Sequence, residues 1–446
     1  MDIFGLIPSF GGLAFTILAF IVALSIIVAV HEYGHYIVGR WSGIHAEVFS
    51  IGFGPVLLSR MDRRGTRWQV AALPLGGYVK FLGDSDAASS GKSAEVDRMQ
   101  AEERRHTMHG APLWARSATV AAGPLFNFAL SILVFAGFFL VQGVGVDRPV
   151  VGSLKPLPQV EETELREGDL ILAVEGVETP DMASFMRVVD EIEPAPTLRY
   201  EVERDGVPRD IMGPYPFPPL ADAVQPQSAA RDVDMRPGDL VLSIDGEPVA
   251  AFRELRDRVA ESEGRPLLLE VWRDGETFDV ALTPRSVDLP VAGGGFETRW
   301  LIGLTGGMVF ETETRRPGVF EALGLGVDRT WFIATTSLSG LWHIITGAIS
   351  SCNLRGPIGI AETSGAMAAD GLASFIWFIA VLSTAVELIN LFPIPILDGG
   401  HLVFHAWEAV TGRPPSDRAL QVLMALGLAM ILTLMVFALG NDLFCP

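Results

Sequence analysis

Long uncharged stretches alternate with polar segments along the chain, and this pattern predicts membrane helices joined by loops and soluble domains. About 20 apolar residues are enough to cross the hydrocarbon core of a bilayer. The stretches of spanning length are residues 3–30, 117–146, 331–353, 371–394 and 419–441, of which only the fourth contains a charged residue, Glu387. The first stretch has no basic start and no cleavage site after it, so we interpret it as a retained helix rather than a signal peptide.

The loop after the first stretch changes character along its length. Residues 47–82 are rich in glycine, β-branched and aromatic residues without a helical period. This composition predicts short strands and hairpins, and irregular backbone beside a membrane site must be shielded by protein or line a wet cavity. Residues 83–107 turn polar, with Ala, Ser, Asp and Glu, and we interpret them as a flexible linker.

The polar region between the second and third stretches contains an internal repeat. Both copies have the pattern G-D-x-[IV]-L-x-[IV]-[ED]-G, then a helical pattern, then E-V-x-R-D-G. The matching segments are 166–176 with 236–246, 181–192 with 251–262, and 201–206 with 270–275. The repeat predicts two small β-rich domains in tandem.

Composition and charge narrow the classes of protein that fit. The 446 residues favour more than one domain, and the mean hydropathy of +0.35 suits a membrane protein with a large soluble part. The net charge of −20 argues against nucleic acid as a partner. The two cysteines, Cys352 and Cys445, exclude a disulfide framework and a cysteine-based zinc site.

The charge is distributed unevenly. Residues 147–316 contain 34 acidic and 18 basic residues, a net charge of −16. Residues 40–116 contain 8 acidic and 11 basic residues, a net charge of +3. Because cytoplasmic loops are enriched in Lys and Arg, we expect residues 40–116 on the cytoplasmic side.

The first apolar stretch ends in His31-Glu32-Tyr33-Gly34-His35, an H-E-x-x-H pattern. On a helix, histidines four residues apart project from one face and can share a metal ion. The glutamate between them can reach a water at the metal and take its proton. Ionisable groups in a membrane helix are costly and usually functional, so the position of this pattern favours a zinc site over a chance occurrence.

A second candidate for metal binding lies near the end of the chain. Pro393 and Pro395 interrupt any helix there, so Asp398 is expected on a kinked or extended segment. A carboxylate beside an apolar stretch is costly unless it is paired or binds a cation. A catalytic zinc commonly has three protein ligands and an open fourth position. His31, His35 and Asp398 form such a set.

Together these segments resemble the site-2 protease family of intramembrane zinc metalloproteases, which combines H-E-x-x-H in the first membrane helix with N-x-x-P-x-P-x-L-D-G in a later one. The further matches are Gly76-Gly77-Tyr78-Val79-Lys80, Gly123-Pro124 with Asn127, and Gly356-Pro357-Ile358-Gly359-Ile360. The repeat resembles PDZ domains, two of which lie between the second and third membrane helices in the regulator-of-sigma-E group of this family. Bacterial members often have S-x-N-L-G before the second motif, whereas this chain has Ala385 and Glu387 in place of Asn and Gly.

The resemblance implies a polytopic α-helical membrane protein with four transmembrane helices, a membrane-associated β-hairpin region and two inserted β-rich, PDZ-like domains. The expected segments are a first transmembrane helix at 1–40, a cytoplasmic-side loop with the β region and polar linker at 41–111, a second transmembrane helix at 112–146, PDZ-like domains at 147–215 and 216–290, an interfacial segment at 291–370, a third transmembrane helix at 371–400, and an amphipathic connection with the fourth transmembrane helix at 401–446.

A zinc site also restricts the topology, because metal–ligand distances of about 2 Å require all ligands at one depth. With the N-terminus outside, the first helix brings its histidines to the cytoplasmic side, and residues 371–391 bring Asp398 to the same side. If residues 331–353 also spanned the membrane, Asp398 would emerge on the opposite side. We therefore expect that stretch at the outer interface or folded against other helices, with both termini and the PDZ-like domains in the periplasm.

The resemblance also implies roles for individual residues. It implies one Zn2+ held by His31, His35 and Asp398, with Glu32 as general base and acid. Asn390 is expected either to hold the substrate backbone or developing oxyanion, or to cap the broken helix.

Other residues have less specific expectations. Gly76, Gly77, Tyr78 and Val79 are expected to clamp an unwinding substrate by strand pairing. A second histidine pair four residues apart has the spacing of a second metal site but no acid between its members, and we expect it to face a loop or interface. The G-P and Asn motif of the second helix is expected to serve close helix packing. These residues are His401, His405, Gly123, Pro124 and Asn127. Glu387 has three open interpretations, since it can face the active-site cleft, pair with a buried donor, or face a wet groove.

The sequence thus predicts a zinc endopeptidase of the bacterial inner membrane that cleaves transmembrane segments of single-pass proteins. The resemblance suggests substrates already trimmed outside, such as anti-sigma factors or signal-peptide remnants, and a PDZ-like pair that contacts peptides or ectodomains or only excludes bulky ones. One alternative is a non-proteolytic PDZ scaffold, against which the intact Glu32 argues. Another is a metal transporter, yet residues 117–146 contain no His, Cys, Asp or Glu.

Overall fold

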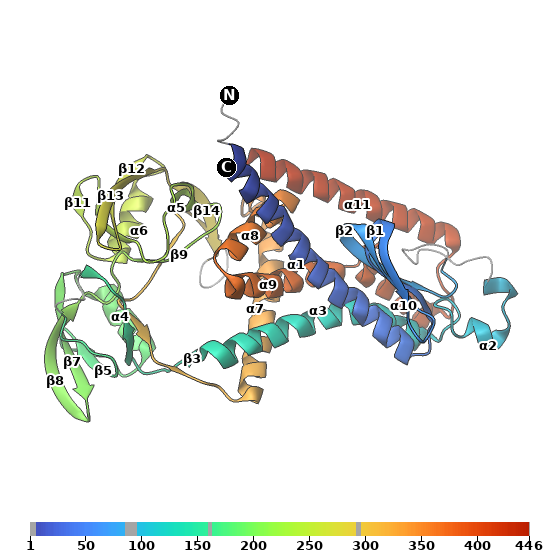
Figure 1. Ribbon diagram of the computed structural model, residues 1–446, viewed down its shortest axis with the longest axis horizontal. Helices are drawn as coiled ribbons and strands as arrows, with labels where there is room; N and C mark the ends of the chain where they lie inside the picture. The colour runs from blue at the N-terminus through green and yellow to red at the C-terminus, as the bar shows by residue number, and fades with distance from the viewer. Residues whose placement is uncertain (1–5, 85–95, 159–162, 291–295, 446) are drawn as a thin grey trace. The chain divides into compact units, whose positions relative to one another are not determined.

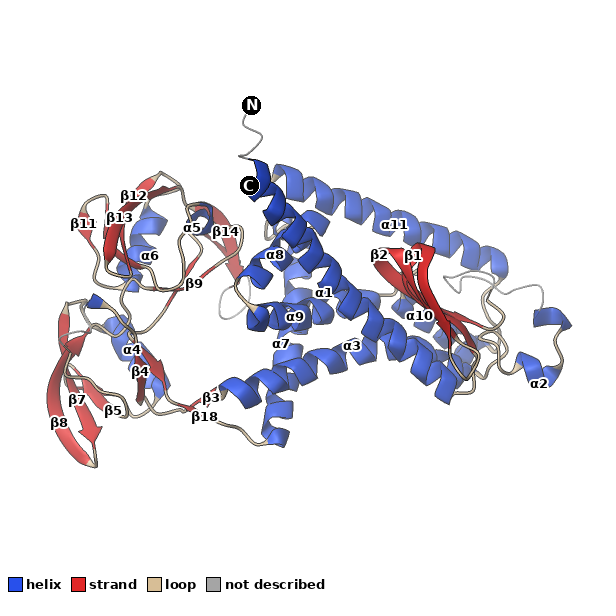
Figure 2. Cartoon of the chain, in the orientation of Figure 1, coloured by secondary structure: helices blue, strands red, loops and turns tan. Residues whose placement is uncertain are grey.

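A computed structural model describes residues 6–84, 96–158, 163–290 and 296–445 of the chain (Figure 1). The chain divides into two compact units. The helical unit comprises the described parts of Met1–Gly137, Val319–Ile345 and Leu354–Cys445, and the sheet unit comprises those of Phe138–Gly318 and Thr346–Asn353. Helices dominate the first unit and strands dominate the second (Figure 2).

Within the described residues, four helices are long and apolar enough to cross a membrane, as the sequence predicts. They are α1 (Leu6–Trp41), α3 (Leu113–Gln142), α9 (Leu372–Asn390) and α11 (Asp417–Phe444). Large apolar side chains such as Leu18, Leu133 and Val436 are exposed on these helices. Exposure of this kind suits contact with lipid, which is as apolar as the side chains.

The stretch at 331–353 lies mostly in α7 (Val319–Ile345), which is not one of these four helices. α7 packs against α3 and α9. A Cβ on Gly326 would lie 2.5 Å from the carbonyl oxygen of Ile132, and the guanidinium of Arg329 lies 5.3 Å from the centre of the Trp377 ring. Packing against other helices is one of the two placements expected for this stretch.

A short helix, α8 (Pro357–Ala369), is fixed at its N-terminus by a carboxylate from α11. Asp442 accepts hydrogen bonds from the backbone N–H groups of Gly356, Ile358 and Gly359 at 2.8, 3.0 and 3.1 Å. A negative charge is favourable at a helix N-terminus because the backbone N–H groups there have no partner within the helix. The side chain therefore ties the last membrane helix to α8.

The loop after α1 forms two long strands, β1 (Ala46–Met61) and β2 (Arg67–Phe81). Gly52 and Gly54, with φ of +91° and +84°, bend β1, and glycine is suited to this left-handed region because it has no Cβ. The first half of β1 lies between the two ends of β2, so that Val48 pairs with both Arg67 and Lys80. The sheet packs against α1 through Tyr36, Phe49 and neighbouring buried residues.

Part of the predicted linker is folded. Residues 85–95 lie outside the described residues, but the segment after them contains η2 (Val96–Arg98) and α2 (Ala101–Arg104). Val96 and Thr107 are fully buried. The polar composition led us to expect a flexible linker, and for residues 96–107 that expectation is wrong because two side chains anchor the segment in the helical unit.

The repeat in the sequence is a repeat of structure. Each copy has a four-stranded antiparallel sheet in the same order and one amphipathic helix. The first copy contains β5 (Leu170–Val174), β6 (Val177–Glu178), α4 (Met182–Glu191), β7 (Thr197–Arg204) and β8 (Val207–Pro214). The second contains β10 (Leu240–Ile244), β11 (Glu247–Pro248), α6 (Phe252–Glu261), β12 (Leu267–Arg273) and β13 (Glu276–Leu282). Both predicted helices are present.

The same buried ion pair stabilises each copy. Asp169 is fully buried and receives two hydrogen bonds at 2.7 Å from Arg204, and Asp239 receives two at 2.6 and 2.7 Å from Arg273. Each aspartate also accepts the backbone N–H three residues before it at 2.8 Å. A buried carboxylate requires such pairing. The Asp of G-D and the Arg of R-D-G in the repeat motif are therefore one structural unit.

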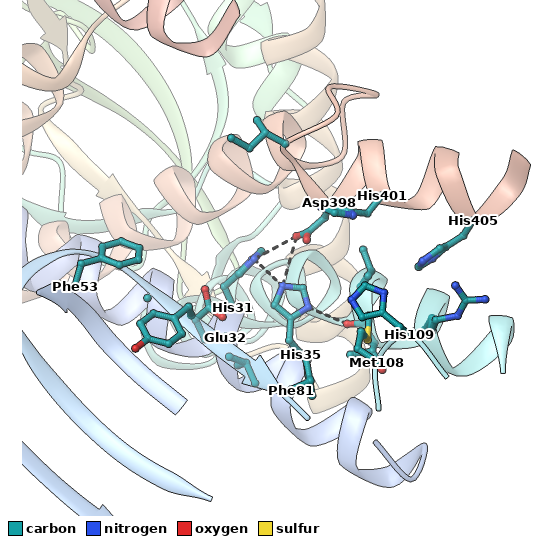
Figure 3. Close-up of a pocket in the computed structure, with 17 residues that line it drawn as sticks. His31, Glu32, His35, Phe53, Phe81, Met108, His109, Asp398, His401 and His405 are labelled. Atoms are coloured by element: carbon teal, nitrogen blue, oxygen red, sulfur yellow. Dashed lines mark hydrogen bonds and ion pairs between the residues drawn. The ribbon is translucent and has the colours of Figure 1, made fainter. Parts of the chain in front are cut away.

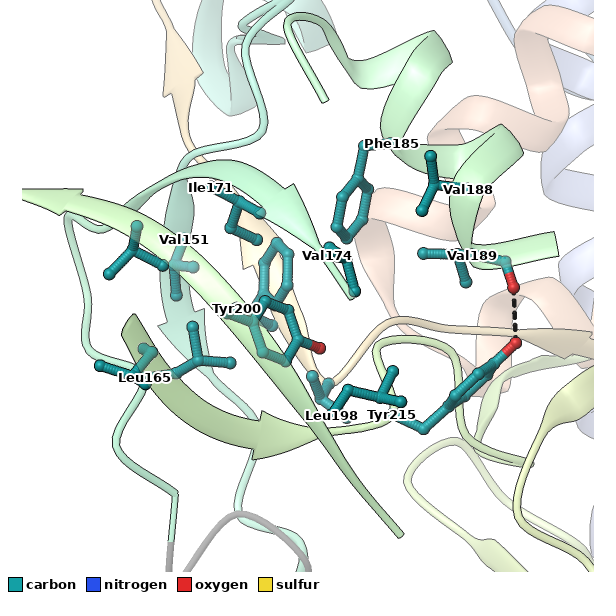
Figure 4. Packing of buried hydrophobic residues seen from close by; sticks show 14 of the residues in the cluster. Val151, Leu165, Ile171, Val174, Phe185, Val188, Val189, Leu198, Tyr200 and Tyr215 are labelled. Atoms are coloured by element: carbon teal, nitrogen blue, oxygen red, sulfur yellow. Dashed lines mark hydrogen bonds between the residues drawn. The ribbon is translucent and has the colours of Figure 1, made fainter. Parts of the chain in front are cut away.

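Aromatic and aliphatic side chains fill the core of the first copy (Figure 4). Phe185 and Val189 of α4 pack against Ile171 and Val174 of β5. The hydroxyl of Tyr215 donates a hydrogen bond of 2.6 Å to the carbonyl oxygen of Val189. A buried tyrosine hydroxyl usually has such a partner because leaving it unpaired is costly.

The sheet unit extends beyond the predicted boundary at residue 290. The chain after the second copy turns back along earlier strands in the order β16 with β9, β17 with β4, and β18 with β3. These strands are β3 (Val144–Gly145), β4 (Val151–Leu154), β9 (Ala221–Val224), β16 (Leu304–Gly306), β17 (Phe310–Thr312) and β18 (Thr314–Arg315). β14 (Arg285–Pro290) and β15 (Phe296–Leu301) form a separate two-stranded sheet. The sheet unit also contains two short helices, α5 (Ala229–Asp232) and η4 (Ser351–Asn353). The segment expected at the interface therefore begins with strands of the sheet unit.

Candidate metal centre and active site

Two histidines of α1 face each other across one helical turn. Nε2 of His31 lies 3.0 Å from Nε2 of His35, and the ring centres are 4.6 Å apart (Figure 3). α3 lies close to this face because Gly34 has no side chain: a Cβ there would be 2.5 Å from the carbonyl oxygen of Ala122. The spacing and the glycine together place both imidazoles at the α1–α3 contact.

Asp398 approaches the same two nitrogens from another part of the chain. Its Oδ2 lies 3.2 Å from Nε2 of His31 and 3.6 Å from Nε2 of His35. α9 ends at Asn390, and Asp398 is the first residue of α10 (Asp398–Thr411). The prolines between the helices exclude a continuous helix. Asp398 is therefore presented at a helix start, after the predicted break.

The turn before α10 is tight because two glycines follow Asp398. A Cβ on Gly399 would overlap the carbonyl oxygens of Leu391 and Phe392, and one on Gly400 would overlap that of Ile394. The backbone of the break therefore lies directly against the first turn of α10. This contact needs residues without side chains, and it sets where Asp398 points.

The three side chains fit a metal ion. Ligands 2.0–2.1 Å from one tetrahedral ion are roughly 3.3 Å from each other, close to the separations of 3.0, 3.2 and 3.6 Å between the facing atoms. Oδ2 of Asp398 is buried and accepts no hydrogen bond from the described residues. A bound cation would give this oxygen the partner that a buried polar atom needs. Among the described residues, His31, His35 and Asp398 are the group with ligand atoms close enough to share an ion. Cys352 and Cys445 are both disulfide-bonded, so neither offers a free thiolate as a further ligand.

The other nitrogen of each histidine faces an oxygen. Nδ1 of His35 lies 2.8 Å from the carbonyl oxygen of Thr119, and Nδ1 of His31 lies 3.0 Å from Oε2 of Glu387. A carbonyl or carboxylate oxygen accepts a hydrogen bond but does not donate one. Each Nδ1 therefore carries hydrogen, and each Nε2 keeps its lone pair for a metal.

His31, His35 and Asp398 line a cavity of about 390 Å³. Its wall includes Glu32 beside His31 (Figure 3). Residues 77–79 of β2 also line it. Gly76 does not line it; a Cβ there would be 2.5 Å from the ring of Phe53. Asn390 does not line it either, since its side-chain amide donates to Oε2 of Glu387 at 3.2 Å. The structure thus brings together the three candidate ligands, Glu32 and part of β2.

His401 and His405 line this cavity as well, so the expectation that they face a loop or interface is wrong. α10 places them on the same face as Asp398. Nδ1 of His405 lies 3.2 Å from Oγ of Ser117. Burial, reinforced by the nearby Arg116 guanidinium, lowers the pKa of His405 to about 4. Its imidazole is therefore neutral at neutral pH.

The G-P and Asn motif in α3, which is expected to serve helix packing, also contacts the candidate site. Gly123 lies against both imidazoles, because a Cβ there would overlap Nε2 of His35 and be 2.8 Å from Cε1 of His31. Asn127 is fully buried and donates to Oε1 of Glu387 at 2.6 Å. A polar side chain in an uncharged membrane stretch was the available signal.

Comparison with known proteins gives results that agree over nearly the whole chain. Residues 19–434 match the model of a protein family that is described as Peptidase family M50. A protein of Agrobacterium fabrum whose name describes a zinc metalloprotease is 37% identical over 430 residues, covering 96% of this chain and 95% of the relative. Two proteins named regulator of sigma-E protease RseP, from Salmonella typhimurium and Escherichia coli, are 34% and 33% identical over 453 residues, covering 95% of this chain and 97% of each relative.

Proposed function

Since the chain belongs to peptidase family M50 and is a zinc metalloprotease of the site-2 type, we propose that it cleaves membrane segments of single-pass proteins already trimmed outside the membrane. One observation carries the proposal: Glu32, His31, His35 and Asp398 line the same cavity. The first three lie near the C-terminal end of α1, an apolar helix long enough to span a membrane. Anti-sigma factors and signal-peptide remnants are the substrate types that we propose.

The protein's own side chains would bind and activate the reactants. His31, His35 and Asp398 would hold one zinc ion, which when bound supplies a Lewis acid that polarises the scissile carbonyl and acidifies water. Glu32 lines the cavity beside His31, and there it can take the proton of the attacking water and later give it to the leaving amine.

A substrate helix must be unwound before it can react, because its carbonyl groups are hydrogen-bonded within the helix. Gly77, Tyr78 and Val79 of β2 line the cavity. We propose that they pair with the unwound substrate as an added strand, in the manner of β-augmentation. Substrates with helix-breaking residues near the cleaved bond should therefore react faster.

We assign the two copies in the sheet unit to PDZ-like domains in the periplasm, which would exclude substrates with bulky ectodomains or bind their peptides. Support comes from the strongly acidic composition of residues 147–316 and the net-basic loop at 40–116. The proposed location is the bacterial inner membrane, with the active site toward the cytoplasm. Labelling of single cysteines from either side, placed at Ser42 in the loop and at the exposed Ser286 of β14 in the sheet unit, would overturn this topology if both reacted from the same side.

The decisive experiment is cleavage of a tagged single-pass peptide by the purified protein in detergent, comparing wild type with Glu32→Gln. We expect the variant to lose at least 1,000-fold in cleavage rate while it retains zinc, because it keeps the ligands and loses the base. Glu47→Gln is the matched control, since Glu47 is a partly exposed residue of β1 that pairs with Lys80 at 3.0 Å. Equal rates for Glu32→Gln and wild type would overturn the role of Glu32. Failure of wild type on several helix-destabilised substrates would favour a non-proteolytic PDZ scaffold.

A further inference from the structure

We propose that Glu387 is a positioning residue for the metal centre, whose carboxylate holds the imidazole of His31 so that Nε2 points at the zinc ion. The inference rests on the proposed role of His31 as a ligand, but not on the proposed substrate. Glu387 lies on α9, one turn before Asn390, and is 1% exposed. It is separated from His31 by 356 residues of sequence, so their contact exists only in the fold.

Both oxygens of this carboxylate are occupied by hydrogen-bond donors. Oε1 accepts from the side-chain amide of Asn127 at 2.6 Å. Oε2 accepts from Nδ1 of His31 at 3.0 Å and from the side-chain amide of Asn390 at 3.2 Å. Three donors, from α1, α3 and the end of α9, therefore converge on one buried group.

The orientation of the Asn127 amide identifies Glu387 as its hydrogen-bond acceptor. The same amide nitrogen that donates to Glu387 also donates to the carbonyl oxygen of Ile27 at 3.1 Å. Both neighbours are acceptors, so the NH2 group, not the amide oxygen, must face Glu387. Asn127 and Asn390 thus both donate to Glu387, which uses its two oxygens as acceptors. Glu387 therefore acts as an acceptor toward Nδ1 of His31.

The two histidines differ in this respect. His35 donates Nδ1–H to a neutral backbone carbonyl, that of Thr119, whereas His31 donates to a carboxylate. A hydrogen bond to a charged acceptor is about twice as strong as a neutral one and makes the imidazole a better metal ligand. The negative charges of Asp398 and Glu387 also match the charge of a divalent cation. This compensation is important where an unbalanced charge is expensive to bury.

The same geometry gives a reason for the unusual sequence before the N-x-x-P motif. Glu387 stands where glycine is frequent in the bacterial pattern described above, and a glycine has no group that could reach His31. The carboxylate of this chain has a specific partner on the metal side of the fold. Of the three interpretations left open by the sequence, the structure therefore favours pairing with a buried donor, and that donor is a candidate zinc ligand.

The test is the zinc affinity of the full-length protein in detergent, measured by competition with a chromophoric chelator in the absence of substrate. We expect Glu387→Gln and Glu387→Ala to bind zinc 10–100-fold more weakly than wild type, as is typical when a partner of a ligating histidine is lost. Thr384→Val is the matched control, because Thr384 is fully buried on the same helix and its hydroxyl donates to the carbonyl of Ala380 in that helix. It should bind zinc within twofold of wild type.

A purely structural role for Glu387 predicts a different result. Thermal midpoints measured with and without zinc would then fall by equal amounts in Glu387→Gln, with unchanged zinc affinity, and this outcome would overturn the proposal. Glu387→Gln preserves the shape of the side chain, so it remains informative if Glu387→Ala does not fold. If wild type itself bound no zinc, the proposed ligand set would be wrong, which is distinguishable from a failure confined to the Glu387 variants.

Discussion

At the scale of single residues, the candidate site depends on glycines, which have no side chain, as much as on the candidate ligands. Gly123 of α3 leaves room for the imidazoles of His31 and His35, and Gly34 of α1 lets the backbone of α3 approach. Without these glycines the two helices could not come so close beside the metal ligands. The contact between α1 and α3 is therefore part of the metal centre and more than helix packing.

Replacing Gly123 with Ala should disturb zinc binding directly. The new Cβ would overlap Nε2 of His35, the atom proposed to bind the ion, so one ring or one helix must move. We expect zinc affinity to fall at least tenfold, measured by chelator competition. Gly137→Ala is the matched control on the same helix, because a Cβ there meets nothing within 4 Å. An unchanged affinity in Gly123→Ala would show that the rings adapt without loss.

At the scale of elements, α10 carries Asp398 and must be held against α3, which contacts both histidines. Arg116 near the start of α3 makes two hydrogen bonds with the carboxylate of Glu408 on α10, at 3.0 and 2.6 Å. Both side chains are mostly buried, with 15% and 18% exposed. A two-bond pair between Arg and a carboxylate fixes orientation as well as distance. This ion pair therefore holds α10 in place.

We expect Arg116→Met to lower the free energy of unfolding by about 2 kcal/mol, a value between those of surface pairs and fully buried pairs. Zinc affinity should fall as well, because Asp398 lies on the helix that the pair holds. The measurements are denaturant unfolding and chelator competition. Arg199→Met serves as the control, since Arg199 and Asp210 are both about 60% exposed and their loss should change stability by less than about 0.5 kcal/mol. Equal effects in the two variants would argue against a special role for the Arg116 pair.

At the scale of the whole molecule, residues 138–318 enter and leave the sheet unit through one pair of strands, and residues 346–353 join the same unit later in the chain. β3 pairs with β18, and Gly145 is directly opposite Thr314. The N–H of Val146 also donates to the carbonyl oxygen of Glu313 at 3.0 Å. A two-residue turn can join antiparallel strands at such a position. The repeat can therefore be removed without stretching the connections to α3 and α7.

A deletion of residues 146–313, with Asn-Gly joining Gly145 to Thr314, tests the proposed filter. If the PDZ-like pair excludes bulky ectodomains, the shortened protein should cleave an untrimmed substrate at least tenfold faster than wild type does. Cleavage of the trimmed substrate should change little, because every cavity-lining residue lies outside the deletion. The readout is the ratio of the two cleavage rates in detergent. The same ratio in both proteins would remove the filter from the proposed function.

Local patterns in the sequence were sufficient for the features with a local cause. The lengths of the uncharged stretches predicted the four helices that can span a membrane, because crossing lipid demands a long apolar run. The repeat predicted two copies of one small sheet with its helix. H-E-x-x-H placed His31 and His35 on one helical face, and the prolines predicted a break before Asp398. Each of these depends on residues that are neighbours along the chain.

The tertiary structure decided the contacts between segments far apart in the sequence. Nothing near Glu387 indicates that it meets His31, or that Asn127 meets Glu387, because these contacts depend on how α1, α3 and α9 pack. The same holds for His405, which faces the cavity, and for β16–β18, which return to earlier strands. The sequence by itself determined which helices and chemical groups this protein has. Only the packing of distant segments, which no local period or spacing encodes, determined which groups meet.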